Sequence, residues 1–304
     1  LGTRHPEMPR RALLSDVRDR DGVIRLVREE APQLVFHAAA LKHVPIVEAQ
    51  PIEGVLTNVI GTRYVADACR QAGVLAMVLI STDKAVNPAS VMGATKRLAE
   101  GYCQALDIAQ SPGGRTRFLT VRFGNVLGST GSVVPLFQRQ IQAGGPLTVT
   151  HPEVSRYFMT TREAVELVLE ASVLGASGKG GTGKILVLDM GEPIRILDLA
   201  KQMIRLAGLE PGADVAISFT GLRPGEKLHE ELFHSGESAL QTEREGILLA
   251  APRAVDLPFL AHAIDELAEA AAAGRADHAL SIHTRLVPEY RPARGGAARA
   301  AAGG

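Results

Sequence analysis

Two short polar clusters contain residues that can move protons. They read Ser81-Thr82-Asp83-Lys84 and Met92-Gly93-Ala94-Thr95-Lys96. An apolar run ends at Ser81, which places the first cluster at the carboxyl edge of a sheet, where open α/β sheets bind their ligands. Met92 and Lys96 are four residues apart and therefore share a face of the following helix. The spacing predicts a crevice lined by two lysines, an aspartate and a hydroxyl, although a capped turn with a solvated lysine explains the first cluster equally well.

Parallel strands joined by crossover helices are predicted to position these clusters. Apolar runs typical of buried strands cover residues 34–37, 76–81 and 117–122. Between them, residues 57–72 and 91–106 have the spacing of amphipathic helices, and Gly73 ends the first one where a left-handed backbone is favoured. Because strands that alternate with helices are typical of the α/β class, we expect a doubly wound, Rossmann-like parallel sheet.

The second half of the chain differs in composition. Residues 124–160 are rich in Gly, Pro and Thr, which predicts long loops around a small lobe. We expect later elements at 161–174 (helix), 185–188 (strand), 195–207 (helix) and 260–273 (helix). This pattern predicts a Rossmann domain over 1–123, a lobe with interleaved Rossmann elements over 124–290, and a disordered tail over 291–304.

Composition excludes several classes of protein. The 33 basic residues equal the 33 acidic ones, so no overall charge favours nucleic acid, and no apolar run of roughly 18 residues predicts a membrane span. Cys69 and Cys103 lie in apolar helical stretches, which favours buried thiols in a reducing cytosol over a disulfide framework. The spacing of His37, His43 and His151 is not that of metal ligands, so we expect no metal.

One expected motif is absent from the start of the chain. A dinucleotide-binding sheet normally opens with a strand, G-x-G-x-x-G and a helix, but no such pattern precedes residue 30. Either the fold binds no dinucleotide, or the first strand and its glycine-rich loop are missing from a fragment.

Several motifs together resemble a single family. Thr82 lies ten residues before Met92, and Lys96 four after it, as in the active-site segment of short-chain dehydrogenases. Further matching segments are His37-Ala38-Ala39-Ala40, Lys42-His43-Val44-Pro45, Thr57-Asn58, Arg122-Phe123-Gly124-Asn125, Ser155-Arg156-Tyr157-Phe158 and Gly221-Leu222-Arg223-Pro224-Gly225-Glu226-Lys227. Over residues 10–292 the chain resembles the UDP-N-acetylglucosamine 4,6-dehydratases of bacterial polysaccharide biosynthesis, which are extended short-chain dehydrogenase/reductases.

The resemblance implies an internal redox cycle with NADP or NAD. A hydride leaves C4 of the sugar, the C5 proton and a water are lost, and the hydride returns to C6. By this resemblance Lys84 abstracts the C5 proton, and Asp83 protonates the leaving hydroxyl. Thr82 hydrogen-bonds near the 4-hydroxyl, and Lys96 holds the nicotinamide ribose.

Met92 departs from the general pattern, in which a tyrosine occupies this position. A thioether has no proton to exchange, so it cannot act as the base of the hydride step. Methionine is often core filler on a helix, but the Met-x-x-x-Lys form also resembles a CapD-like branch of the dehydratases. In that branch Asp83 would also take the C4 proton, and the configuration at C5 would be retained.

The resemblance also assigns binding residues. On the cofactor side it implies Asp16 at the adenine amino group, Ala38 and Ala39 at a close approach, and Asn125. The UDP-sugar would be bound by Lys42, Asn125, Arg156, Arg223 and Glu226. For Arg156 a structural salt bridge is an equally good explanation. We expect a cytoplasmic homo-oligomer that binds no nucleic acid and contacts the inner membrane only through upstream segments.

Two other functions stay open. A UDP-sugar 4-epimerase or dehydrogenase would keep a tyrosine at position 92 and would not need the pair formed by Asp83 and Lys84. A fragment that binds UDP without cofactor, and is therefore catalytically incompetent, is the third possibility.

Overall fold

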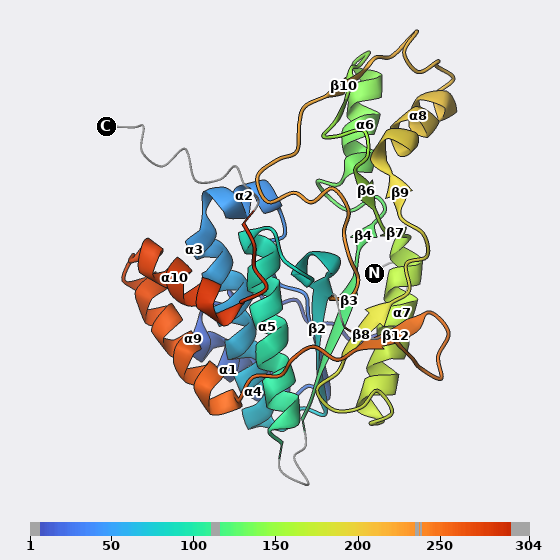
Figure 1. Cartoon of the computed structure of the whole chain (residues 1–304). Helices are drawn as coiled ribbons and strands as arrows, with labels where there is room; N and C mark the ends of the chain where they lie inside the picture. Colours follow the sequence, from blue (N-terminus) through green and yellow to red (C-terminus); the bar gives the residue numbers. More distant parts are fainter. Residues whose placement is uncertain (1–6, 111–115, 235–236, 238, 293–304) are drawn as a thin grey trace.

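A six-stranded sheet lies at the centre of the protein (Figure 1). The structure is a computed structural model that describes residues 7–110, 116–234, 237 and 239–292. The strand order is β1-β2-β3-β8-β12-β11; the first four strands run parallel, β12 pairs antiparallel with β8, and β11 pairs antiparallel with β12. Their bounds are Leu34–His37 (β1), Ala76–Thr82 (β2), Arg117–Phe123 (β3), Ile185–Leu188 (β8), Ile247–Ala250 (β12) and Leu240–Gln241 (β11). The predicted Rossmann-like α/β class is confirmed.

Helices cover both faces of this sheet (Figure 1). One face carries α1 (Arg20–Glu30), α4 (Thr62–Ala72), α5 (Val91–Ile108), α9 (Leu257–Ala272) and α10 (Ala276–Leu286). Helix α7 (Thr161–Ala176) packs on β3 and β8 from the other face. The short helices α2 (Val44–Ala49) and α3 (Pro51–Gly54) lead into a π-helical segment, η1 (Val55–Gly61), which continues as α4.

A local sequence signal determines where α5, the helix that carries Met92 and Lys96, begins. Ser90 precedes α5, and its Oγ accepts a hydrogen bond from the N–H of Gly93 at 3.1 Å, a normal N-cap. Gly73 ends α4 with φ of +68°, as the sequence predicted. The strand predictions are also confirmed, since β1 and β8 have the expected bounds and β2 and β3 are one residue longer.

The small lobe contains more regular structure than expected. Besides the expected helix α8 (Ile196–Leu206), it holds α6 (Val133–Gln142) and the parallel pair β5 (Leu147–Val149) and β10 (Ile217–Phe219). The prediction of loops through 124–160 was therefore wrong for α6. Its apolar stripe includes the fully buried Phe137, and Pro135 is tolerated because it lies in the first turn. Glycines and threonines around this stripe obscured the helical pattern.

Two further expectations concerned a disordered tail and membrane-spanning helices. Residues 293–304 of the expected disordered tail lie outside the described residues. Within the described ranges, none of the helices is long and apolar enough to cross a membrane.

The division into domains at residue 123 stays a prediction. Strands from the second half of the chain complete the sheet that the first half begins.

Candidate active site

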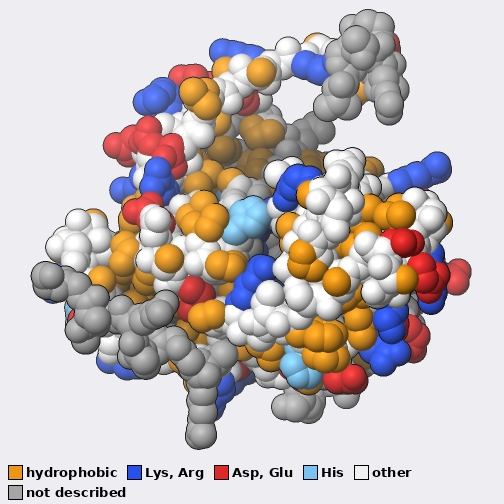
Figure 2. Space-filling model, turned by 90° about the horizontal axis from the view of Figure 1, so that it is seen from above, with side chains coloured by type: hydrophobic (Ala, Val, Ile, Leu, Met, Phe, Trp, Pro, Cys, Tyr) orange, Lys and Arg blue, Asp and Glu red, His pale blue; other side chains and the backbone are white. Residues whose placement is uncertain are grey.

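A cavity of about 470 Å³ opens where β2 and β3 end, between the sheet and the small lobe. Seen from above, the molecule is hollowed, with apolar, basic and acidic side chains around the hollow (Figure 2). The cavity brings together most of the residues that the sequence singled out. They are Ala38, Lys42, Thr82, Lys84, Met92, Lys96, Asn125, Arg156, Arg223 and Glu226.

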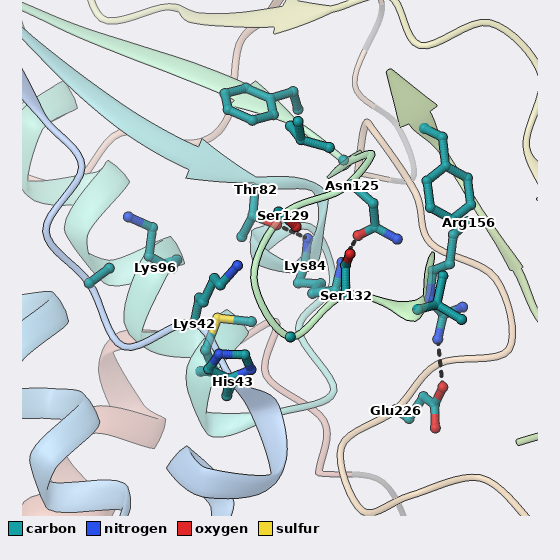
Figure 3. Close-up of a pocket in the computed structure, with 18 of the residues that line it drawn as sticks. Lys42, His43, Thr82, Lys84, Lys96, Asn125, Ser129, Ser132, Arg156 and Glu226 are labelled. Atoms are coloured by element: carbon teal, nitrogen blue, oxygen red, sulfur yellow. Dashed lines mark hydrogen bonds and ion pairs between the residues drawn. The ribbon is translucent and has the colours of Figure 1, made fainter. Parts of the chain in front are cut away.

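The predicted functional groups lie in a row across the cavity. Figure 3 shows Lys96 toward one side and the pair of Arg156 and Glu226 toward the other, with Thr82 and Lys84 between them. The cofactor, sugar and nucleotide positions that the sequence resemblance implies along this row stay predictions.

Thr82, Asp83 and Lys84 form one hydrogen-bonded unit at the end of β2. Oδ1 of Asp83 accepts hydrogen bonds from Oγ1 of Thr82 and from Nζ of Lys84, both at 2.9 Å. Oγ1 of Thr82 also accepts from the N–H of Lys84 at 3.4 Å, so the turn is capped as one interpretation required. The lysine is nevertheless not solvated, since its side chain is 22% exposed and lines the cavity.

Asp83 is fully buried and does not itself line the cavity. Its Oδ2 has no hydrogen-bond partner among the residues that the structure describes. Gly124 allows this close packing, because a Cβ there would lie 3.0 Å from both Oδ2 of Asp83 and Cβ of Tyr157. The carboxylate therefore reaches the cavity through the two polar groups bonded to Oδ1.

The charge on Lys84 is held by its neighbours. Its Nζ also donates to Oδ1 of Asn125 at 3.2 Å and lies 3.8 Å from Oε1 of Glu230. Burial lowers the pKa of Lys84, but the carboxylates of Asp83 and Glu230 outweigh burial and leave the pKa above its ordinary value. The resting side chain is therefore an ammonium group.

Lys96 has the opposite electrostatic character. Its Nζ donates to the carbonyl of Ile80 at 2.7 Å, and burial lowers its pKa to about 8 although Glu100 opposes the shift. Nearby His37 is hydrogen-bonded to Oγ1 of Thr62 at 2.9 Å. Burial, with a smaller effect of Lys96, lowers the pKa of His37 to about 4. Burial thus favours the neutral form of both side chains at this end of the cavity.

Asn58 positions the wall of the cavity near Lys42. Its side chain accepts from the N–H of Leu41 at 2.7 Å and donates to Oγ1 of Thr95 at 3.0 Å. It therefore links the π-helical segment η1 to the loop after β1 and to α5. π-Helical segments such as η1 are frequent at functional sites.

Arg156 and Glu226 form an ion pair at the far end, with Nη2 of Arg156 3.0 Å from Oε1 of Glu226. Oε1 also accepts from Thr150 at 3.0 Å, and Oε2 accepts from the N–H of Arg223. The salt bridge that the sequence offered as an alternative for Arg156 exists, and the same side chain lines the cavity. In contrast, the guanidinium of Arg223 has no hydrogen bond or ion pair within the described part of the chain, which leaves it available to a ligand.

Sequence comparison places the chain in a family. The pattern of the polysaccharide biosynthesis proteins matches residues 3–252. The chain belongs to this family. The capsular polysaccharide biosynthesis protein CapD of Staphylococcus aureus is 52% identical over 225 residues, which are 74% of this chain and 36% of CapD. The chain therefore spans about a third of the length of that relative.

Other relatives differ in their named activities. A UDP-N-acetylglucosamine 4,6-dehydratase (inverting) of Campylobacter jejuni is 35% identical over 80% of this chain and 68% of its own length. A UDP-glucose 4-epimerase of Rickettsia typhi is 40% identical over 67% of this chain and 57% of its own length. Among solved structures, Pen from Bacillus thuringiensis superposes with a TM-score of 0.71 at 31% identity, over 87% of this chain and 85% of that one.

In this polysaccharide biosynthesis protein, two predicted cofactor residues lie outside the cavity. Ala38 lines it, but Ala39 does not. Asp16 is exposed and pairs with Arg18, whose Nη2 lies 2.7 Å from Oδ2 of Asp16, and this hydrogen bonding lowers the pKa of Asp16 to about 2. Within the described ranges, no three or more His, Cys, Asp or Glu side chains are grouped as a metal site.

Several cavity residues were not singled out from the sequence. Ser132 precedes α6, and its buried Oγ has no partner among the residues described. Ser132 and Val133 at the amino end of α6 line the cavity, and the amino end of a helix is a favourable position for an anion. Ser129 and His43 also line the wall, and Nζ of Lys42 donates to the carbonyl of Thr130 across it at 2.9 Å. A serine directly before an apolar stripe is the signal that would have identified this cap.

Proposed function

We propose that this chain carries the catalytic centre of a nucleotide-sugar 4,6-dehydratase. It would convert UDP-N-acetylglucosamine to a UDP-4-keto-6-deoxy sugar with NAD or NADP. The observation that supports this most is the contact of Lys84 Nζ with Asp83 Oδ1 at 2.9 Å beside the hydroxyl of Thr82. Such a pair supplies both a base for C5 and an acid for the C6 hydroxyl, which a simple dehydrogenase does not require.

The Lys96 end of the cavity fits a nicotinamide cofactor. Lys96 can donate further hydrogen bonds beyond that to Ile80, and Ala38 at the end of β1 leaves room for close approach. When bound, the cofactor would accept the hydride from C4 and return it to C6. Lys96 would hold the ribose hydroxyls of the nicotinamide.

Burial of Asp83 determines how it can exchange protons with a sugar. Because it does not line the cavity, the C4 hydroxyl proton would pass to Asp83 through Oγ1 of Thr82. Asp83 would then return this proton to the departing C6 hydroxyl, which leaves as water. Lys84 would first release its ammonium proton to solvent in the cavity, then take the proton from C5, and return a proton to C5 after the hydride has reached C6. Protons and electrons balance, and the cofactor is not consumed.

The small-lobe end of the cavity fits the UDP group. The guanidinium of Arg223 can bind phosphate through two hydrogen bonds. Ser132 and the amino end of α6 offer further donors, and Glu226 can accept from ribose hydroxyls. Lys42 and Asn125 would contact the substrate between these ends. The expected homo-oligomer and cytoplasmic location stay predictions.

A 4-epimerase is the second candidate, because a relative with that name is 40% identical. The pair of Asp83 and Lys84 favours the dehydratase, because an epimerase removes no proton from C5 and expels no hydroxyl from C6. The test is to incubate UDP-N-acetylglucosamine with NAD or NADP and a version of the protein that carries the glycine loop. A dehydratase gives a product lighter by one water without accumulating reduced nicotinamide. Unchanged product mass supports the epimerase, and steady accumulation of reduced nicotinamide supports a dehydrogenase.

A further inference from the structure

A buried carboxyl group lies behind Lys84, outside the cavity. It belongs to Glu230, in the irregular segment 221–234 that returns from the small lobe toward the sheet. Its side chain is 4% exposed, and its Oε2 has no hydrogen-bond partner among the described residues. Its Oε1 lies 3.8 Å from Nζ of Lys84 and 3.8 Å from Nε of Arg156. Glu230 thus lies between the proposed base and the ion pair of the nucleotide end.

The distances separate two kinds of contact on Lys84. Asp83 at 2.9 Å and Asn125 at 3.2 Å accept hydrogen bonds, which fix where the ammonium group points. The contact with Glu230 is too long for a hydrogen bond and acts through charge. An opposite charge at about 4–6 Å favours the charged form of its neighbour by about one to three pKa units.

We propose that Glu230 is a positioning residue that, as a carboxylate, keeps Lys84 protonated, so that the ammonium group stays hydrogen-bonded to Asp83 and Asn125. When Glu230 is protonated, the proton affinity of Lys84 is lower, so Lys84 can release its own proton to solvent in the cavity and become a base. The meaning of this for catalysis rests on the proposed dehydratase function, in which Lys84 must become neutral before it can take the C5 proton.

The surroundings of Glu230 allow such a change of charge. The charged groups that face it are Lys84, Asp83, Arg156 and Lys227. Burial raises the pKa of Glu230, and the negative charge of Asp83 raises it further. The positive charges of Lys84, Arg156 and Lys227 lower it, but the pKa stays above its ordinary value. Asp83 and Arg156 also face Lys84, so Glu230 is one of two carboxylates that hold its proton. No redox partner is needed, because only a proton moves.

The titration of Lys84 itself tests this inference on the chain as it is. The protein has seven lysines, so ¹³Cε resonances of labelled lysine can be followed against pH, and Lys84→Arg identifies the Lys84 signal. We compare Glu230→Gln with Glu231→Gln. The neighbouring Glu231 is a matched control because its side chain is 47% exposed and bonds to Lys227 and Asn87 instead.

We expect the Lys84 midpoint to fall by about one to three pH units in Glu230→Gln and to stay at the parent value in Glu231→Gln. An unchanged midpoint in Glu230→Gln, or an equal fall in both variants, overturns the inference. Should Glu230→Gln not fold, Glu230→Met, which is uncharged and of similar length, gives the same readout. The measurement needs neither cofactor nor sugar, so its outcome is independent of whether the protein proves to be a dehydratase.

Discussion

Arg122 on β3 and Glu100 on α5 form an ion pair in which both side chains are completely buried, with Nη2 and Oε2 2.8 Å apart. Oε1 of Glu100 also accepts from Oγ of Ser81 at 2.6 Å. The pair therefore fixes the helix of Met92 and Lys96 against the two strands whose ends form the cavity.

Removing one member of this pair should destabilise the protein strongly. Glu100→Ala leaves Arg122 charged and unpaired in the core, which costs about 3–5 kcal/mol. The matched control is Glu166→Ala, because Glu166 pairs with Arg162 in an exposed i,i+4 contact worth less than about 1 kcal/mol. Denaturant unfolding of both variants measures the difference, and equal losses would show that the buried pair contributes little.

Asp83→Asn and Lys84→Ala should stop different steps in a version that carries the glycine loop. Asp83→Asn keeps the shape but cannot accept the C4 proton, so reduced nicotinamide should not form in a single turnover. Lys84→Ala should still oxidise C4, but solvent deuterium should not enter C5. Rapid absorbance and mass spectrometry give the two readouts. If Asp83→Asn reduces cofactor as fast as the parent, another group is the C4 base.

Met92→Tyr should not accelerate C4 oxidation, because Thr82 and Asp83 already provide the proton path. The larger side chain enters a site where Met92 is 3% exposed, so we expect a loss of stability of about 1–3 kcal/mol from overpacking. Thermal unfolding and single-turnover kinetics check both parts. A clear gain in oxidation rate would instead indicate that the site is a tyrosine-dependent one that has lost its base.

UDP should bind this chain more tightly than NADP, because the Arg223 end of the cavity is formed whereas no glycine-rich loop was found in the sequence. Arg223→Ala should weaken UDP binding about 10- to 100-fold, since hydrogen bonds to charged groups contribute about 1.5–3 kcal/mol. Arg162→Ala, on the distant helix α7, is the control. Calorimetric titration with both nucleotides decides the matter, and tighter binding of NADP would refute the prediction.

Stability should decrease on the acidic side because of His37. Its pKa is about 4 in the folded protein, against an ordinary histidine value of 6.5. Between these values the unfolded chain binds more protons, so stability falls as the pH falls from 6.5 to 4, by up to about 3 kcal/mol. His37→Leu should flatten this part of the curve. Urea unfolding at several pH values tests it, and parallel curves for parent and variant would exclude His37 as a cause.

Much of the sheet and the cavity could be predicted because the signals are local. Apolar runs defined β1 and β8, and the spacing from Thr82 to Lys96 placed both on the same cavity. The rest depends on contacts between distant segments. Glu230 reaches Lys84 from the other half of the chain, and the burial of Asp83 depends on packing against Gly124 and Tyr157. No periodicity in the sequence reports such contacts.

Tight packing around Asp83 gives it a property that its sequence neighbours lack. The backbone at Gly124 leaves no room for a side chain, and the carboxylate has no exposed surface. The fold thus insulates Asp83 from bulk water. Among the residues that the structure describes, the Thr82 hydroxyl and the Lys84 amine are the groups hydrogen-bonded to this carboxylate, so a proton taken from a bound sugar stays within the site until one of them accepts it.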